Sequence, residues 1–240
     1  MPGNLVEVTA YAPTLAAPVI RARQVAAGRV LRAGQVAAGR VLRAGHLAGR
    51  APAISALVVL VTISDSVTRW VVSNPDAWEQ WASTNLVNLH RHPLTALFAS
   101  AFVSPDVLGT DLLILAVAGI LLESRVGWRR TLGVAAAGHV LATLITEGAV
   151  LLAILSGNEA RQAAWQLDVG ISYVTWTVLG ASLLFVPRPW RGYAVTAALG
   201  YLVVQLTFTW DMTAWGHVTS LVIGLLSWPL LKAAPKRNRV

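Results

Sequence analysis

The sequence predicts an all-α, polytopic membrane protein with six transmembrane helices, and two observations carry that prediction. Of the 240 residues, 55% are hydrophobic and 12% are charged, which is too apolar for a soluble domain of this size. Stretches of about 20 mostly uncharged residues also recur along the chain. A helix satisfies its backbone hydrogen bonds within one segment, as lipid requires, so these stretches are predicted to form a helical bundle.

The composition also excludes several classes of function. The chain has no cysteine, so disulfides, thiolate catalysis and cysteine-ligated metal sites are excluded. No HEXXH motif supports a zinc protease, and we expect neither a metal nor a cofactor. The net charge is +8, but aromatic residues are not interleaved with the basic ones. Nucleic acid is therefore not an expected partner.

Residues 1–50 are predicted to be a basic, low-complexity arm. The stretch QVAAGRVLRAG at 24–34 is repeated identically at 35–45, and an 11-residue period is close to three helical turns. One face would then carry Arg29, Arg32, Arg40 and Arg43. Because each repeated glycine weakens a helix by about 1 kcal/mol, we expect a mostly disordered tail that anchors to anionic membrane lipids.

The transmembrane domain is predicted over residues 51–232, followed by a basic tail at 233–240. The first span, 51–72, contains Asp65 and Arg69 at the i,i+4 spacing that favours a local ion pair. A long polar loop follows at 73–93, and 94–108 is interpreted as a folded, partly submerged loop. The other predicted spans are 109–122, 131–155, 169–186, 193–209 and 213–231.

The orientation follows from the distribution of lysine and arginine, which concentrate on the cytoplasmic side of membrane proteins. With six spans, the basic arm, the turns at 125–130 and 187–192 and the basic tail all fall on one side. The sequence therefore predicts an integral multi-pass protein of the plasma membrane, with both termini in the cytoplasm.

Two stretches place chemically useful side chains near the outer ends of spans. Ser172 lies in DVGISYVTWTVLG at 168–180, and His217 lies in WGHVTSLVIG at 215–224. If both stretches are helical, a rise of about 1.5 Å per residue puts Ser172 about 6 Å below Asp168 and His217 about 9 Å below Asp211. A serine needs such a base to become a nucleophile. The alternatives are a serine bonded to its own helix and a chance packing arrangement.

Small residues beside both side chains would let the two helices approach closely. On the sixth span they recur every four residues, and on the fourth span they flank Ser172. They are Gly216, Ser220 and Gly224 on the sixth span, and Gly170 and Gly180 on the fourth. Close approach is what a serine–histidine hydrogen bond of about 2.6–3.2 Å requires.

Residues 93–224 resemble the rhomboid family of intramembrane serine proteases, in a divergent bacterial form. The family carries Gly-x-Ser-Gly on its fourth helix, with an aromatic residue and then a small residue at four-residue steps. It also carries His-x-x-Gly-x-x-x-Gly on its sixth helix and Glu-x-x-x-Gly after its second. The similar residues here are Gly170, Ser172, Trp176 and Gly180, then His217, Ser220 and Gly224, then Glu123 and Gly127. The resemblance implies a Ser172–His217 dyad that cleaves transmembrane helices.

Two departures from the family's pattern bear on activity. Tyr173 stands where the family has the second glycine, and Val107 and Asp111 stand where it has the oxyanion-binding histidine and asparagine. Valine donates no hydrogen bond and an ionised Asp111 would repel the oxyanion, where each donor is worth about 3 kcal/mol. Asn85, Asn88, His90 and His92 in the first loop are candidate substitutes.

Two other functions remain open. One is a catalytically inactive relative that binds transmembrane-helix clients instead of cleaving them. The other is a transporter, because His139, Thr143 and Glu147 share one face of the third span and polar residues there are functional candidates. Interhelical hydrogen bonds are the favoured interpretation of these three residues, and the inverted repeats typical of carriers are not evident.

Overall fold

The computed structural model describes residues 49, 51–103, 109–209 and 211–232. The basic arm with its repeats, Val107 and the tail 233–240 lie outside these residues. Within the described ranges every element is a helix and no strand occurs, so the all-α class is confirmed. The helices are α3 (Pro52–Trp70), α4 (Pro75–Ala82), α5 (Leu86–Arg91), α6 (Pro93–Ser100), α7 (Gly109–Val126), α8 (Trp128–Leu155), η1 (Arg161–Trp165), α9 (Ser172–Ser182), η2 (Leu183–Phe185), α10 (Arg188–Phe208), α11 (Met212–Leu226) and α12 (Trp228–Lys232).

Two sequence-based expectations about element boundaries are wrong. The stretch 94–108 was expected to be a loop, but α6 occupies its first part and begins with Pro93, a residue well suited to the first helical position. The fourth span is predicted at 169–186, but α9 begins only at Ser172. Gly170 has φ 123°, a conformation that a right-handed helix does not allow. The depth estimate counted from Asp168 is therefore wrong as well.

Three helical stretches in the described part of the chain are long and apolar enough to cross a membrane, namely Pro52–Trp70, Trp128–Leu155 and Met212–Lys232. Ser172–Phe185 is apolar but shorter. Helix α7 carries Asp111, Glu123 and Arg125 within its 18 residues, which lowers its hydropathy. The spans of the polytopic fold are thus partly identified, and the count of six remains a prediction.

Helix α8 shows the distribution of polarity expected of a membrane protein. Its inward face buries polar side chains, whereas large apolar side chains point outward. The buried polar residues are Thr131, His139, Thr143, Thr146 and Glu147, and the exposed apolar ones include Leu141, Leu144, Ile145, Leu151 and Leu152. In water this arrangement would be unfavourable. In lipid, apolar side chains face the acyl chains and polar ones pack between helices.

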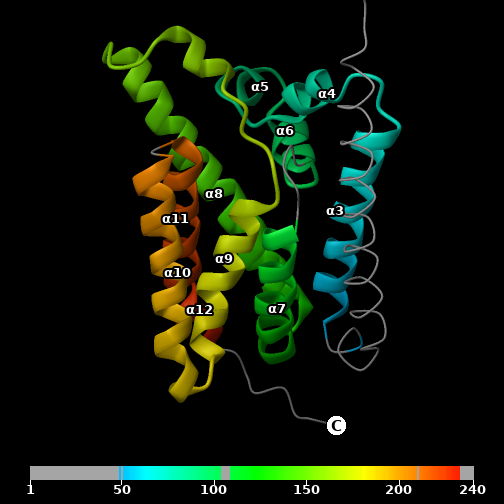
Figure 1. Cartoon of the computed structure of the whole chain (residues 1–240), viewed down its shortest axis with the longest axis vertical. Helices are drawn as coiled ribbons and strands as arrows, with labels where there is room; N and C mark the ends of the chain where they lie inside the picture. The colour runs from blue at the N-terminus through cyan, green and yellow to red at the C-terminus, as the bar shows by residue number, and fades with distance from the viewer. Residues whose placement is uncertain (1–48, 50, 104–108, 210, 233–240) are drawn as a thin grey trace, which may run out of the picture. The chain divides into compact units, whose positions relative to one another are not determined.

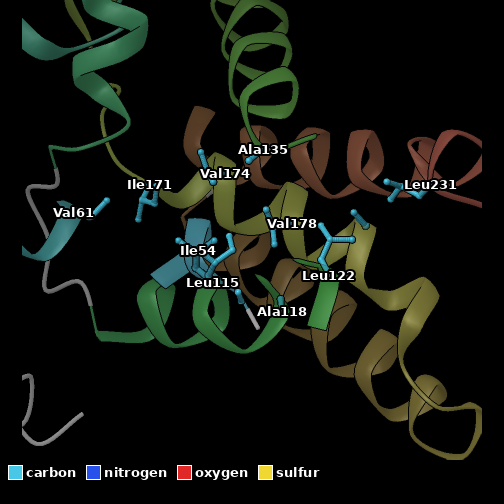
Figure 2. Close-up of a cluster of buried hydrophobic side chains, with 12 residues drawn as sticks. Ile54, Val61, Leu115, Ala118, Leu122, Ala135, Ile171, Val174, Val178 and Leu231 are labelled. Atoms are coloured by element: carbon cyan, nitrogen blue, oxygen red, sulfur yellow. The ribbon is translucent and has the colours of Figure 1, made fainter. Parts of the chain in front are cut away.

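The short helix α9 lies inside the bundle, between α7, α8 and α11 (Figure 1). Two apolar clusters meet on it. The first joins Ile54 of α3 and Leu115 of α7 to Val174 and Val178 of α9 (Figure 2). The second packs Trp176 and Leu183 against residues of α10 and α11, which are Ala198, Leu202 and Leu221. Both faces of α9 are therefore fixed by packing.

Glu123 near the end of α7 caps the N-terminus of α3. Its two carboxylate oxygens accept hydrogen bonds from the backbone N–H groups of Ala53 at 3.0 Å and Ile54 at 2.8 Å. These donors have no partner within α3, and the helix dipole favours a negative charge there. Four residues later Gly127, with φ 83°, starts α8. Capping of α3 by Glu123 and the positive φ of Gly127 before α8 explain why a glutamate is followed four residues later by a glycine.

Replacing Glu123 by alanine should destabilise the fold by about 2 kcal/mol, because a buried and a partly buried N–H donor lose their acceptor. Glu123→Gln keeps one carbonyl acceptor and should lose less. The measurement is the unfolding midpoint in mixed detergent micelles. The exposed Glu159 supplies the control, since Glu159→Ala should change stability by about 0.5 kcal/mol or less. Equal losses at both positions would show that the cap contributes nothing.

Candidate active site

The extended segment before α9 is held by the α4–α5 connection and the end of α6. The backbone N–H of Thr84 donates to the Asp168 carbonyl at 2.8 Å, and the Thr84 hydroxyl donates to the Asp168 carboxylate at 2.9 Å. The Asp168 N–H donates to the Ser83 hydroxyl at 2.9 Å. Two residues on, the Gly170 N–H donates to the Ser100 carbonyl at 2.7 Å. These bonds fix the point at which α9 begins.

Ser172 is the first residue of α9 and is half-buried. The bend that brings the chain into the helix uses Gly170 at φ 123°, where a side chain would be strained. N–H groups in the first turn of a helix lack intrahelical acceptors and carry the positive end of the helix dipole. Ser172 therefore combines a hydroxyl with backbone donors suited to a developing negative charge.

His217 lies on α11 and is buried. Its ring stacks on Trp176 of α9 with centroids 5.5 Å apart, and it meets the edge of Tyr173 at 6.0 Å. Ser172 is one helical turn before Trp176, so the two share a face of α9. The imidazole of His217 therefore lies on the face of α9 that also carries Ser172. No hydrogen bond between Ser172 and His217 occurs in the structure of these described residues.

The two ring nitrogens of His217 differ in their contacts. Nδ1 lies 2.8 Å from Oε1 of Gln205 on α10, and an amide oxygen only accepts hydrogen bonds. With the amide oxygen in this position, the contact is a hydrogen bond when Nδ1 carries the proton of the neutral ring, which leaves the lone pair on Nε2. Nε2 is buried and has no hydrogen-bond partner in the described chain. Sequence reasoning missed Gln205, although an amide within an otherwise apolar segment is a recognisable signal.

Small residues set the distance between α9 and α11. A Cβ on Gly224 would overlap the Thr177 carbonyl, and one on Gly180 would overlap the Leu221 carbonyl. Gly216 lies directly under the ring of Tyr173. Ser220, on the same face, is fully buried and its hydroxyl has no partner among the residues described. The two backbones thus touch along this face, as a small-residue repeat favours.

Tyr173, the departure from the family's glycine, is accommodated by Gly216. Its ring lies between the rings of His217 and His139, the latter at 6.4 Å. Its hydroxyl forms hydrogen bonds with Asp168 and Thr146. Burial raises the pKa of Asp168, which precedes the span, against the opposing effect of hydrogen bonds from Thr84 and Tyr173. Tyr173 therefore links the first turn of α9 to Asp168 before the helix and to Thr146 on α8.

The candidate oxyanion donors lie in different settings. Asp111 is in the first turn of α7, and its backbone carbonyl accepts from the Thr175 hydroxyl at 3.5 Å. The amide N–H groups of Asn88 donate hydrogen bonds to the backbone carbonyls of Gln80, Trp81 and Ser83. The amide nitrogen of Asn85 and Nδ1 of His92 are buried without a partner in the described ranges, whereas His90 is exposed.

The polar face of α8 does not form a continuous chain of hydrogen bonds. Nε2 of His139 contacts the Leu97 carbonyl at 2.9 Å and the Ser100 hydroxyl at 3.2 Å, so it joins α8 to α6 as an interhelical bond. The Thr143 hydroxyl and one oxygen of Glu147 have no partner in the described structure. Among the described residues, no hydrogen bond joins these three side chains to one another.

The described helices, with their buried polar faces and exposed apolar ones, define a polytopic α-helical membrane protein. A family model described as rhomboid-like protein matches residues 49–237. The chain therefore belongs to the rhomboid-like protein family, and the family resemblance seen in the sequence is confirmed. No curated protein matches the chain. No solved structure matches it either.

Proposed function

We propose that this protein is an intramembrane serine protease in which Ser172 is the nucleophile and His217 the base. The single observation that carries the proposal is the stacking of His217 on Trp176, one turn from Ser172, with Nε2 buried and unpartnered in the described chain. A buried imidazole with a free lone pair beside a helix-terminal serine is suited to proton transfer.

In the proposed reaction, the Ser172 hydroxyl oxygen attacks the scissile carbonyl carbon and its proton passes to Nε2 of His217. The backbone N–H of Ser172, in the first turn of α9, donates to the oxyanion. The His217 proton then goes to the leaving amine as the peptide bond breaks. Water, deprotonated by His217, hydrolyses the acyl-enzyme. By family resemblance, the substrate is a membrane helix with small, helix-weakening residues near its outer end.

A second candidate is a catalytically inactive relative that binds membrane helices. The observations that favour it are the lack of a Ser172–His217 hydrogen bond in the described structure and the packing of Tyr173 on Gly216 next to Ser172. The positions of the family's two oxyanion donors hold Val107 and Asp111 instead. Binding without cleavage requires none of the missing groups.

A serine-directed fluorophosphonate distinguishes the two candidates. We expect the wild-type protein in membranes to take up the probe and Ser172→Ala to abolish uptake, because the probe reacts only with an activated hydroxyl. Ser182→Ala is the matched control, since Ser182 lies on the same helix and its hydroxyl donates to the Leu179 carbonyl. Uptake that survives Ser172→Ala, or no uptake by folded wild type, would favour the inactive helix binder.

We also propose that both termini face the cytoplasm, on the basis of the Lys/Arg asymmetry. Reporter fusions at Arg129 and Arg188 should report the cytoplasm, and fusions at Glu79 and Glu159 the outside. Each site lies near the end of a described helix. An inverted result at any two of them would contradict the orientation.

A further inference from the structure

We infer that Gln205 is a positioning residue for His217, which it holds in the tautomer that has its proton on Nδ1. The inference deepens the proposed function and rests on it for its catalytic consequence. The contact is a 2.8 Å hydrogen bond between Nδ1 of His217 and Oε1 of Gln205. This hydrogen bond joins α11 to α10. Because the two residues lie on different helices, their pairing cannot be recognised from their spacing in the sequence.

A second contact of Gln205 agrees with its amide oxygen facing His217. The amide nitrogen lies 3.5 Å from the hydroxyl of Tyr201, one turn earlier on α10. In this orientation the Tyr201 hydroxyl accepts from the amide N–H, and the amide oxygen accepts from the N–H at Nδ1 of His217. With the nitrogen towards Tyr201, Oε1 is the atom presented to the imidazole.

The imidazole is thereby restrained in two directions. Trp176 stacks on its face at 5.5 Å and in turn packs against the ring of Tyr201 at 5.4 Å. Gln205 holds its Nδ1 edge. Ring plane and tautomer are both set by neighbours, and Nε2 is left as the nitrogen able to take a proton. In serine hydrolases a third residue fulfils this role for the base; here a neutral amide would fulfil it inside the membrane.

A neutral amide suits this location better than a carboxylate. An ionised group within a transmembrane helix is costly unless it is paired, and a neutral acceptor already fixes the position of the Nδ1 hydrogen. The cost of placing the Gln205 amide in an apolar segment is offset when its oxygen and nitrogen both have partners. The bonds to His217 and Tyr201 provide those partners.

The first test is the tautomer of His217, read by nitrogen NMR of protein labelled with ¹⁵N-histidine in detergent micelles at alkaline pH. The chain has five histidines, and His217→Phe identifies the relevant signals. We expect Nδ1 to be protonated and Nε2 unprotonated in the wild type, and a mixture of tautomers in Gln205→Leu. Unchanged signals in Gln205→Leu, or a wild-type ring protonated at Nε2, would overturn the inference.

The second test is the rate of fluorophosphonate uptake. We expect Gln205→Leu to lower it about 10- to 100-fold, as loss of a group that orients a functional histidine typically does. Gln205→Glu, which keeps the acceptor, should retain most of the rate. Thr207→Val is the matched control, because the Thr207 hydroxyl on α10 donates back to the Val203 carbonyl of its own helix. A full rate in Gln205→Leu would contradict the positioning role.

The two tests separate failure of this inference from failure of the proposed protease. If folded wild type takes up no probe, the protease proposal fails, but the NMR measurement still decides whether Gln205 sets the tautomer. If Gln205→Leu does not fold, Gln205→Asn replaces it. The shorter asparagine side chain keeps an amide, but its oxygen no longer reaches Nδ1 of His217. The tautomer signal and the uptake rate should therefore change as they do for leucine.

Discussion

Gly224→Ala is expected to destabilise the bundle by about 3 kcal/mol and to lower the folded amount in membranes. The added methyl group would overlap the backbone carbonyl of Thr177 and approach the Ala181 nitrogen to 2.9 Å. Backbone atoms inside a packed helix pair cannot turn aside as a side chain can, so α9 and α11 would have to separate. Because α9 carries Ser172 and α11 carries His217, separation should also reduce probe uptake.

Gly200→Ala is the control for this prediction. Gly200 lies on α10 and a Cβ there would meet no atom within 4 Å, so stability should change by about 1 kcal/mol or less. The measurement is the detergent unfolding midpoint of both variants beside the wild type. Equal midpoints for Gly224→Ala and Gly200→Ala would show that the α9–α11 contact is not close.

His217→Ala is expected to reduce fluorophosphonate uptake about 10²- to 10⁴-fold, the usual contribution of a general base. The reason is that Nε2 of His217 is buried and has no hydrogen-bond partner among the described residues, which leaves it able to take the Ser172 proton. The folded amount should fall much less, because the small residues of α11 and the packing of Trp176 still hold α9 against α11.

Thr219→Val supplies the matched control on the same helix, since the Thr219 hydroxyl bonds back to the Trp215 carbonyl. Its uptake should equal that of the wild type. If His217→Ala labels as fast as Thr219→Val, the base is another group and the dyad is wrong.

The sequence predicted the helical bundle and most helix positions, because long apolar runs directly reflect the cost of placing polar groups in lipid. The ends of α3 and α8 lie within a few residues of the predicted spans. The Glu123 and Gly127 pair was recognised by resemblance, and the structure supplies its physical cause in the capping of α3. The helical spans depend on local composition, and the Glu123–Gly127 pair depends on a four-residue spacing, so both can be read from the sequence.

The features that sequence reasoning missed depend on contacts between distant residues. The start of α9 is set by the bonds of Asp168 to Ser83 and Thr84 and of Gly170 to Ser100, which no local helical count includes. The partner of His217 is Gln205 on another helix. Tyr173 stands next to Ser172 in place of the family's glycine, and whether its bulk is tolerated depends on Gly216, 43 positions later.

The most direct test of the account is to locate the fluorophosphonate adduct by peptide mapping and tandem mass spectrometry. The wild-type protein should carry a single adduct on the Ser172 hydroxyl oxygen, and the adduct should be missing from both Ser172→Ala and His217→Ala. An adduct on another residue, or an unmodified Ser172 in protein shown to be folded, would contradict the assignment of Ser172 as an activated nucleophile.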